Sequence, residues 1–307
     1  MLKWILIGKS LLVILCLTGR GEMEKIILTT ESGSDVPQAM ADELGIRIAP
    51  MHVILGDESY PDRTIPVADV FAFFKRTKKM PTTSAVNPEE YTAFFLKLRE
   101  ENPEAEIIHI AYSSKASCTY QNAKIALDEL RDARIRLIDS ETVSSGIALL
   151  LWKSAQVIEG AQSADQAEEL IRGLIRRERV SFLPDTLEYL RAGGRVSNAA
   201  YLGTSLLRLK VLINMVDGRL VASKKYRGDM EKVSFQYLED FVKNLGGNRD
   251  AIILFYAEGF SLPLLERLKD RCRQMGFDQV LSTDIGCVIS CHGGPGVMGL
   301  AAFADEA

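Results

Sequence analysis

The sequence predicts a two-domain α/β protein with a mostly parallel sheet in its first half. Short runs rich in β-branched residues alternate with amphipathic segments of roughly 10–15 residues, which is the pattern of βαβ units. The length of 307 residues suits about two domains. Apolar residues make up 47% of the chain and charged residues 25%. These ordinary globular values exclude a disordered or collagen-like chain.

The charge and cysteine content narrow the class of protein further. The net charge is −4, and no long block of like charge occurs. Nothing therefore indicates a nucleic-acid partner. The five cysteines are an odd, sparse set without a Cys-x-x-Cys pair, which indicates free thiols in a reducing compartment. We therefore expect a cytoplasmic protein.

Residues 1–22 form a doubtful extension ahead of Met23. Lys3 and the apolar run after it resemble a secretory signal. However, Lys9 splits the run and leaves about eight apolar residues, near the lower limit for a signal core and short of the ~20 that span a membrane. Purine-rich codons for residues 20–22 would look like a bacterial ribosome-binding site. We expect the chain to start at Met23, and a secreted or membrane-anchored location only if residues 1–22 are a genuine signal.

The first domain is predicted over residues 23–160. Its β-rich runs are 25–30, 46–55, 106–113 and 134–140, and its helical patterns are 37–45, 67–78, 89–101 and 144–160. Segment 113–130 is predicted as a loop that leads into a further helix. Asp35 suits the N-cap of the first helix, Pro37 its first turn and Gly45 its C-cap. Segment 81–88, with proline at both ends, is predicted as a loop.

The second domain is predicted over residues 161–307, with a boundary near 160–163 that rests on composition alone. Asp217-Gly218 stands between two apolar runs and predicts a hairpin. The helical patterns here are 164–178, 230–245 and 261–276, and the strand patterns are 251–257 and 279–290. A glycine-rich segment follows from His292. It matches Gly-x-Gly-x-x-Gly, but only eight residues remain after Gly299, so a dinucleotide site is rejected.

Strong catalytic motifs are missing from the sequence, which has no Gly-x-Ser-x-Gly elbow, no His-Glu-x-x-His and no Walker loop. His109 lies in an apolar run and is expected to be a satisfied core residue, and His52 to be structural. His292 opens the glycine-rich segment, where a ligand-facing role and a structural role are equally expected. On an extended strand Cys287 and Cys291 would stand ~13 Å apart, too far to share a metal ion. We expect them to be buried apolar residues.

Three clusters of hydroxyl side chains follow or precede predicted strands and helices. They are Thr82, Thr83 and Ser84; Ser113, Ser114, Ser117 and Thr119; and Ser140, Ser144 and Ser145. Ligands of open α/β sheets bind beyond the carboxyl ends of the strands, where hydroxyls can donate to a carboxylate or phosphate. Simple N-capping explains any one cluster equally well. Together the clusters suggest a pocket for an anion.

The motifs in this order resemble the DegV family of bacterial two-domain α/β proteins. The matching segments are LTTESGSDV (28–36), PTTSAVNP (81–88), YSSKASCTYQNA (112–123), LIDSETVSSG (137–146), TLEYLRAGGRVS (186–197), GTSLLRLKVLINMVDGRL (203–220) and CHGGPGVMG (291–299). The resemblance implies a carrier that holds one long-chain fatty acid in an apolar tunnel between its domains. Such a carrier presents the carboxylate to a separate ATP-dependent fatty acid kinase for phospholipid synthesis.

The resemblance also implies which residues hold the carboxylate. Carried over, they are Thr82 or Thr83, Ser117 and His292, with Arg195 at the same end of the pocket and in kinase docking. The additional pocket residues are Ser32, Ser84, Ser114, Cys118 and Gly293. The apolar segments Ile147–Trp152 and Ala199–Leu207 are expected to line the tunnel.

Two residues depart from the family pattern. Cys118 stands where glycine is usual and would be costly if φ there must be positive. Glu31 replaces a shorter aspartate.

The implied carrier has no catalytic residues, metal or cofactor of its own. The sequence is also compatible with a transient membrane contact. Two alternatives remain. One is a phosphotransferase-like enzyme component that carries phosphate on His292, although the scarcity of acid–base partners argues against it. The other is a secreted or anchored lipid-binding protein.

Overall fold

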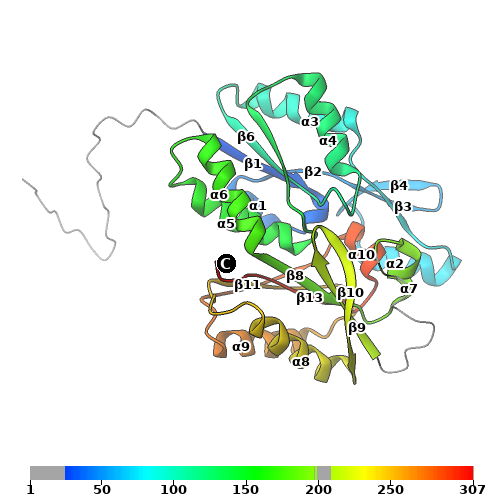
Figure 1. Cartoon of the computed structure of the whole chain (residues 1–307). Coiled ribbons are helices and arrows are strands. Elements are labelled where there is room, and N and C mark those ends of the chain that lie inside the picture. Colours follow the sequence, from blue (N-terminus) through cyan, green and yellow to red (C-terminus); the bar gives the residue numbers. More distant parts are fainter. Residues whose placement is uncertain (1–24, 197, 199–208, 307) are drawn as a thin grey trace, which may run out of the picture.

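The computed structural model describes residues 25–196, 198 and 209–306 and arranges them in stacked layers of helices and sheets (Figure 1). A parallel four-stranded sheet in the order β2-β1-β6-β7 forms the N-terminal part. Its strands are β1 (Ile26–Glu31), β2 (Arg47–Ala49), β6 (Glu106–Ala111) and β7 (Ile135–Asp139). The predicted parallel sheet is confirmed.

Different helices cover the two faces of this sheet because successive side chains of a strand point to opposite sides. The helices of this part are α1 (Gln38–Leu44), α3 (Pro88–Glu101), α4 (Thr119–Leu130), α5 (Ser145–Ile158) and α6 (Ala164–Arg177). Ile27 and Ile107 pack in one apolar cluster with residues of α3 and α4. Leu28 and Ile108 face the other way and pack in a second cluster with residues of α5 and α6. The alternation of side chains thus fixes the order of the layers.

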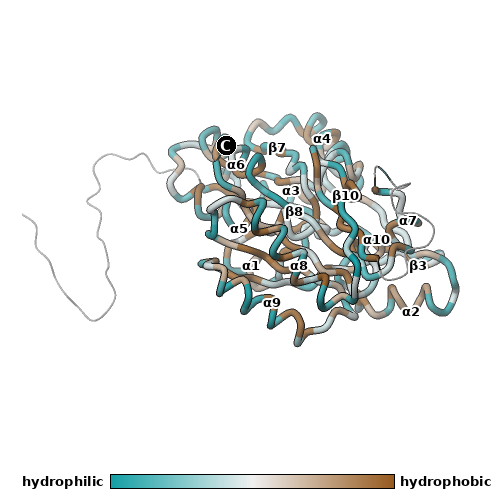
Figure 2. The backbone as a smooth tube through the Cα atoms, turned by 60° about the horizontal axis from the view of Figure 1, so that its bottom comes forward, coloured by the Kyte–Doolittle hydropathy of each residue, from teal (hydrophilic) through white to brown (hydrophobic). Residues whose placement is uncertain are grey.

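A mixed six-stranded sheet in the order β10-β9-β8-β13-β11-β12 forms the C-terminal part. Its strands are β8 (Glu178–Leu183), β9 (Leu209–Val216), β10 (Arg219–Arg227), β11 (Ala251–Tyr256), β12 (Gln279–Asp284) and β13 (Met298–Phe303). The outer face packs against α8 (Met230–Lys243) and α9 (Leu262–Gln274). Both helices alternate hydrophilic and hydrophobic segments along the chain, as expected for helices with one side in solvent (Figure 2).

Helix α5 lies between the two sheets and is apolar around much of its circumference. Leu149, Leu150 and Leu151 are fully buried. They belong to a single cluster that includes Ile110 of the first sheet and Phe255 of the second. A helix buried on several sides needs such a composition. Because this core is continuous, the division into domains at residues 160 and 161 stays a prediction.

A third, small sheet lies beside the two large ones and brings the C-terminal part into contact with the N-terminal part. The sheet has the antiparallel order β4-β3-β5. The elements here are β3 (His52–Leu55), β4 (Glu58–Pro61), β5 (Thr82–Ser84), α2 (Val67–Thr77), α7 (Glu188–Gly193) and α10 (Cys287–Gly293). Helix α10 contacts α2, α7, β3 and β5. It therefore connects the C-terminal part of the chain with the N-terminal part.

The structure confirms the two predicted glycine turns and corrects two predicted segments of the first domain. Gly45 ends α1 with φ of 65°, and Asp217-Gly218 joins β9 to β10 with both φ angles positive, both as predicted. Segment 46–55 is two strands, because Pro50 has no N–H to continue the ladder. Segment 81–88 contains the short strand β5 rather than only a loop.

Two errors concern residues near the pocket. Asp35 does not cap α1: it closes a 3₁₀ turn (Ser32–Ser34) with φ of 54°, and α1 follows Pro37. The predicted strand 279–290 ends at Asp284, and helix α10 begins at Cys287. Buried carboxylates accept the N–H groups of Gly286 and Val288, which stabilises a helix start there. His292 therefore belongs to a helix and not to a loop.

Within the described ranges, no helix has the length and apolar character needed to cross a membrane.

Gly299→Ala is expected to destabilise the protein by about 1–3 kcal/mol, because the added Cβ would overlap the ring of Phe255 on the neighbouring strand. Gly160→Ala is the matched control, since the nearest atom to its Cβ is 3.8 Å away and its φ is not positive. Urea unfolding of both variants measures the difference. Equal free energies of unfolding for the two variants would contradict the close packing at Gly299.

Candidate functional site

A narrow pocket lies between the two large sheets and takes its lining from both halves of the chain. Its cavity volume is about 70 Å³. The N-terminal half contributes Met51, Thr83, Tyr112, Ala116, Ser117, Val143 and Ser144. The C-terminal half contributes Phe182, Leu190, Arg195, Leu220, Phe255, Val288, Ile289, His292, Gly293 and Val297. Most of these side chains are apolar, and the polar ones come from a few loops and from α10.

His292 is held in the last turn of α10 and faces Thr83 of β5. Its Nε2 and the Thr83 hydroxyl share a hydrogen bond of 2.9 Å. Its Nδ1 is buried and has no hydrogen-bond partner among the described residues. Burial and then the charge of Arg195 lower the pKa of His292 to about 4. The imidazole is therefore neutral at physiological pH, and its Nδ1 lies against Gly193 of α7.

Ser117 stands in a tight turn between β6 and α4. The carbonyl of Ser113 accepts the N–H groups of Ala116 and Ser117, at 3.0 and 3.1 Å. The Ser113 hydroxyl donates to the carbonyl of Gly218 in the β9–β10 hairpin, at 2.7 Å. This second bond fixes the loop against the C-terminal half. Cys118 has φ of −80°, so the departure from glycine causes no backbone strain there.

Tyr112 and Ser144 line the pocket, although neither is among the site residues that the resemblance implied. The Tyr112 N–H donates to Glu31 at 3.0 Å, and burial raises the pKa of its hydroxyl well above the ordinary value. Ser144 has φ of 51°, an uncommon angle for serine that often marks functional sites. The sequence indicated Ser144 only as a member of the hydroxyl cluster with Ser140 and Ser145. The positive φ of Ser144 could not be predicted from the sequence.

Glu31, the second departure, is fully buried below the pocket in a polar cluster of its own. Its carboxylate accepts hydrogen bonds from Tyr91 and from Tyr112, and pairs with His109 at 3.0 Å. Burial raises the pKa of Glu31, but the His109 charge and these hydrogen bonds outweigh it, so the pKa is lowered. His109 also bonds Thr29 at 2.8 Å, which confirms it as a satisfied core residue.

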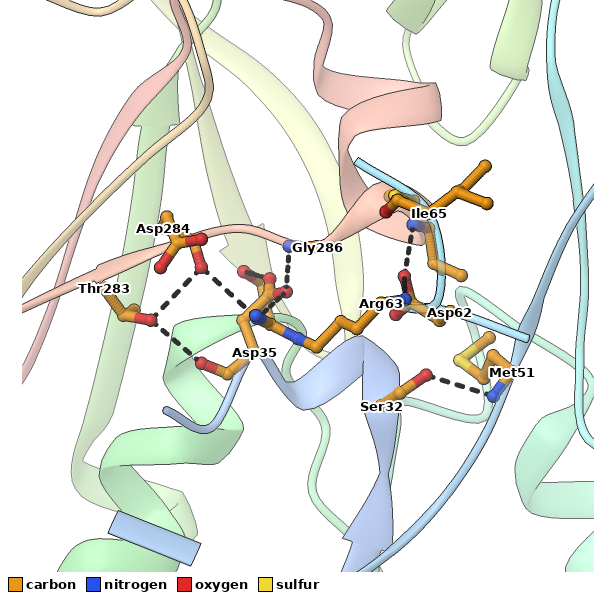
Figure 3. Close-up of polar contacts among 12 residues, drawn as sticks. Ser32, Asp35, Met51, Asp62, Arg63, Ile65, Thr283, Asp284 and Gly286 are labelled. Atoms are coloured by element: carbon orange, nitrogen blue, oxygen red, sulfur yellow. Dashed lines mark hydrogen bonds and ion pairs between the residues drawn. The ribbon is translucent and has the colours of Figure 1, made fainter. Parts of the chain in front are cut away.

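The structure brings together five of the ten predicted site residues. Those that line the pocket are Thr83, Ser117, Arg195, His292 and Gly293. Those that do not are Ser32, Thr82, Ser84, Ser114 and Cys118. Thr82 and Ser84 are exposed because they alternate with Thr83 along β5. Ser114 and Cys118 are also exposed, and Ser32 is buried and accepts the Met51 N–H at 3.0 Å (Figure 3).

The apolar lining also differs in part from the prediction. Ile147–Trp152 does not line the pocket, because α5 turns these side chains into the core between the sheets. Val143 and Ser144, just before α5, line it instead. Segment Ala199–Leu207 lies outside the described residues.

The two cysteines of α10 are one helical turn apart, so the strand geometry expected for them was wrong. Cys287 and Cys291 are both buried, as predicted. Burial raises the pKa of the Cys287 thiol to about 11. Within the part of the chain that the structure describes, no group of three His, Cys, Asp or Glu side chains could hold a metal ion.

Comparisons with known proteins agree on one family. The family model described as "Uncharacterised protein, DegV family COG1307" matches residues 25–305. A DegV domain-containing protein of Caldanaerobacter subterraneus subsp. tengcongensis is 31% identical over 289 residues, which cover 92% of this chain and 100% of the relative.

Solved structures show the same likeness. A DegV family protein from Thermus thermophilus, described by its fatty acid binding, is 29% identical with a TM-score of 0.82, and the match covers 92% of this chain and 100% of that one. A stearic acid-binding protein from Eubacterium ventriosum, at 23% identity, has a TM-score of 0.74, with 92% and 98% covered. This second likeness concerns the fold alone.

Gly193→Ala is expected to move His292 away from Thr83, because the new Cβ would stand 2.6 Å from Nδ1. NMR titration of the imidazole should then give a pKa nearer the ordinary 6.5 than to 4. Gly173→Ala, in α6, is the control, since its nearest neighbour is 3.8 Å away. An unchanged His292 titration in Gly193→Ala would contradict the contact.

Proposed function

The chain belongs to the DegV family, and from that premise we propose that it binds one long-chain fatty acid in the pocket between its two sheets. The observation that carries the proposal is a mostly apolar pocket with a few polar side chains in its lining, of which Thr83 and His292 share a hydrogen bond. A fatty acid has the matching form of one polar head on a long apolar tail. The fatty acid binding described for the Thermus thermophilus relative supports the same ligand.

The carboxylate would be held by Thr83, Ser117 and His292, with Arg195 nearby. A carboxylate that leaves water needs several donors to offset its desolvation. Two hydroxyls and a neutral imidazole can supply them. The hydrogen bond between the Thr83 hydroxyl and Nε2 of His292 already brings two members of this set together.

The acyl tail would lie along the apolar lining. Each buried CH₂ contributes ~0.8 kcal/mol, so a tail of about sixteen to eighteen carbons would supply most of the affinity. Phe182, Leu220 and Phe255 offer apolar surface from three strands of the second sheet.

We further propose that the protein acts as a cytoplasmic carrier and not as an enzyme. It would present the carboxylate to a separate ATP-dependent kinase that forms an acyl phosphate. Arg195 supports this role, because it lines the pocket and is also exposed, where it can meet a partner. No cofactor of its own is required.

Phosphotransfer through His292 is the weaker alternative. A phosphate-carrying histidine needs a partner that orients the ring and stabilises its charged form. The one hydrogen-bond partner of His292 among the described residues is the Thr83 hydroxyl, and burial favours the neutral ring. Both observations favour His292 as a hydrogen-bond donor to a carboxylate over His292 as a carrier of phosphate.

Recombinant protein is expected to carry a fatty acid from its host. Denaturing extraction followed by mass spectrometry should find about one equivalent of a long-chain acid, and the intact protein should show no phosphohistidine. A protein that extracts empty and has no affinity for any acyl chain would refute the proposal.

Ser117→Ala should weaken acyl binding by roughly 10- to 150-fold, because a hydrogen bond to a charged group contributes ~1.5–3 kcal/mol. Ser114→Ala is the matched control, since Ser114 belongs to the same loop but is exposed and does not line the pocket. Titration calorimetry with palmitate measures both. Equal affinities in the two variants would remove Ser117 from the site.

A further inference from the structure

Asp35 is a fully buried carboxylate that the proposed binding site does not use directly. It follows the 3₁₀ turn after β1, and its side chain has no exposed surface. One oxygen accepts the N–H of Gly286 at 2.7 Å and lies 3.3 Å from the Arg63 guanidinium. The other accepts the Ser144 hydroxyl at 2.5 Å. Three separate segments therefore meet on one side chain. Figure 3 shows Asp35 with Arg63 and Gly286 from two of them.

Two of these segments form the pocket. Gly286 is the N-cap of α10, which carries the lining residues Val288, Ile289 and His292. Ser144 lines the pocket itself and is held with φ of 51°. The Asp35 carboxylate thus ties the start of α10 to the start of α5. Since α10 has only seven residues, a shift at its first residue reaches His292 within two turns.

Other groups around Asp35 reinforce the same attachment. Asp62 accepts the Val288 N–H at 3.2 Å, so a second carboxylate holds the start of α10. Arg63 also donates to the carbonyl of Asp284 at 3.3 Å, and Thr283 donates to the backbone carbonyl of Asp35 at 3.2 Å. Asp35 is therefore joined to both sides of the turn between β12 and α10.

We infer that Asp35 is a positioning residue of the pocket, and that the affinity for the acyl carboxylate falls when Asp35 becomes protonated. The inference rests on the proposed function. Hydrogen bonds to an ionised acceptor are roughly twice as strong as those between neutral groups. A protonated Asp35 also loses its attraction to Arg63. Both changes loosen the start of α10 and Ser144 without removing any group that touches the ligand.

The surroundings of Asp35 place its titration near neutral pH. Burial raises its pKa to about 7, against the lowering effects of Arg63, the Gly286 N–H and the Ser144 hydroxyl, and Asp62 raises it further. Tyr112 and Cys287 are also close enough to interact with the Asp35 charge, but burial raises the pKa values of both, so both stay neutral in this range. The side chain of Asp284 is exposed beside Arg63. Acidification from pH 8 to 5.5 would therefore discharge Asp35 while His292 stays neutral.

Stability and affinity should respond to this proton in opposite directions. The pKa of Asp35 is higher in the folded chain than its ordinary 3.8, so the folded state binds the proton more tightly than the unfolded state. The resulting stabilisation is fully present below pH ~4 and is lost as the pH rises through about 7. A loss of affinity at acid pH that came from unfolding would instead be accompanied by a loss of stability.

The test compares palmitate binding to the delipidated full chain from pH 5.5 to 8.5 in wild type and Asp35→Asn. Asparagine keeps the shape of the neutral form. Wild type should bind about tenfold tighter than Asp35→Asn at pH 8.5, with the ratio approaching one at pH 5.5. The titration of palmitate itself is common to both proteins and cancels in this ratio. Urea unfolding should show wild type gaining stability relative to Asp35→Asn as the pH falls.

Glu178→Gln is the matched control. Glu178 is also buried, and burial raises its pKa to about 8, with the Thr142 hydroxyl and Arg179 opposing. Its carboxylate lies against Gly146 of α5 but holds neither Gly286 nor Ser144. Glu178→Gln should therefore keep the pH dependence of wild type. If Glu178→Gln lost the pH dependence of palmitate affinity to the same extent as Asp35→Asn, Asp35 would have no particular role.

Arg63→Gln provides a second variant should Asp35→Asn fail to fold. Loss of the nearby cation raises the pKa of Asp35, so the fall in affinity should begin at a higher pH than in wild type. An unshifted profile, or a constant ratio of wild type to Asp35→Asn at every pH, would overturn the inference and leave fatty acid binding standing. Palmitate binding to none of the proteins at any pH would refute the proposed function itself.

Discussion

The hydrogen bond from the Gly286 N–H to the buried Asp35 carboxylate is the interaction on which the pocket depends. It joins residues 251 positions apart at 2.7 Å, and it fixes α10 against the N-terminal elements. Together with the bond from the Val288 N–H to Asp62, it helps to set the position of His292 relative to Thr83 of β5, in the other half of the chain. The apolar layers bring the two halves together, but hydrophobic contact is not directional. Hydrogen bonds to a buried carboxylate supply the direction.

Two buried carboxylates below the pocket show how surroundings decide the charge of a group. Glu31 has a pKa below its ordinary value, because His109 and the donors Tyr91 and Tyr112 outweigh the cost of burial. Asp35 has a pKa of about 7, because burial raises it more than Arg63 and the donors Gly286 and Ser144 lower it. Glu31 therefore serves as a permanent anion in the frame of the first sheet. Near neutral pH, Asp35 exists in both its protonated and its ionised form. Of the two carboxylates, it is Asp35 that bonds the pocket-lining residue Ser144.

Much of this arrangement could be predicted from the sequence, and what could not depends on contacts between distant residues. Strand–helix alternation predicted the parallel first sheet, and Asp217-Gly218 predicted the β9–β10 hairpin of the second sheet, because both signals are local. Thr83, Ser117 and His292 came from motifs and do line the pocket. The strand predicted over 279–290 was wrong, because the helix start at Gly286 is stabilised by Asp35 and Asp62 from the other half of the chain.

The polar end of the pocket combines neutral donors with a cation at its edge, and this combination suits a ligand that must leave again. A fully buried arginine would form a strong charge-assisted pair with a carboxylate and would cost much to separate. Here burial keeps His292 neutral, and Arg195 lines the pocket while remaining exposed to water. Under the proposed function, most of the affinity would then come from the tail, which is apolar and indifferent to charge. The head group would be held well enough to be oriented, yet it would remain accessible to a partner that approaches along the side of Arg195.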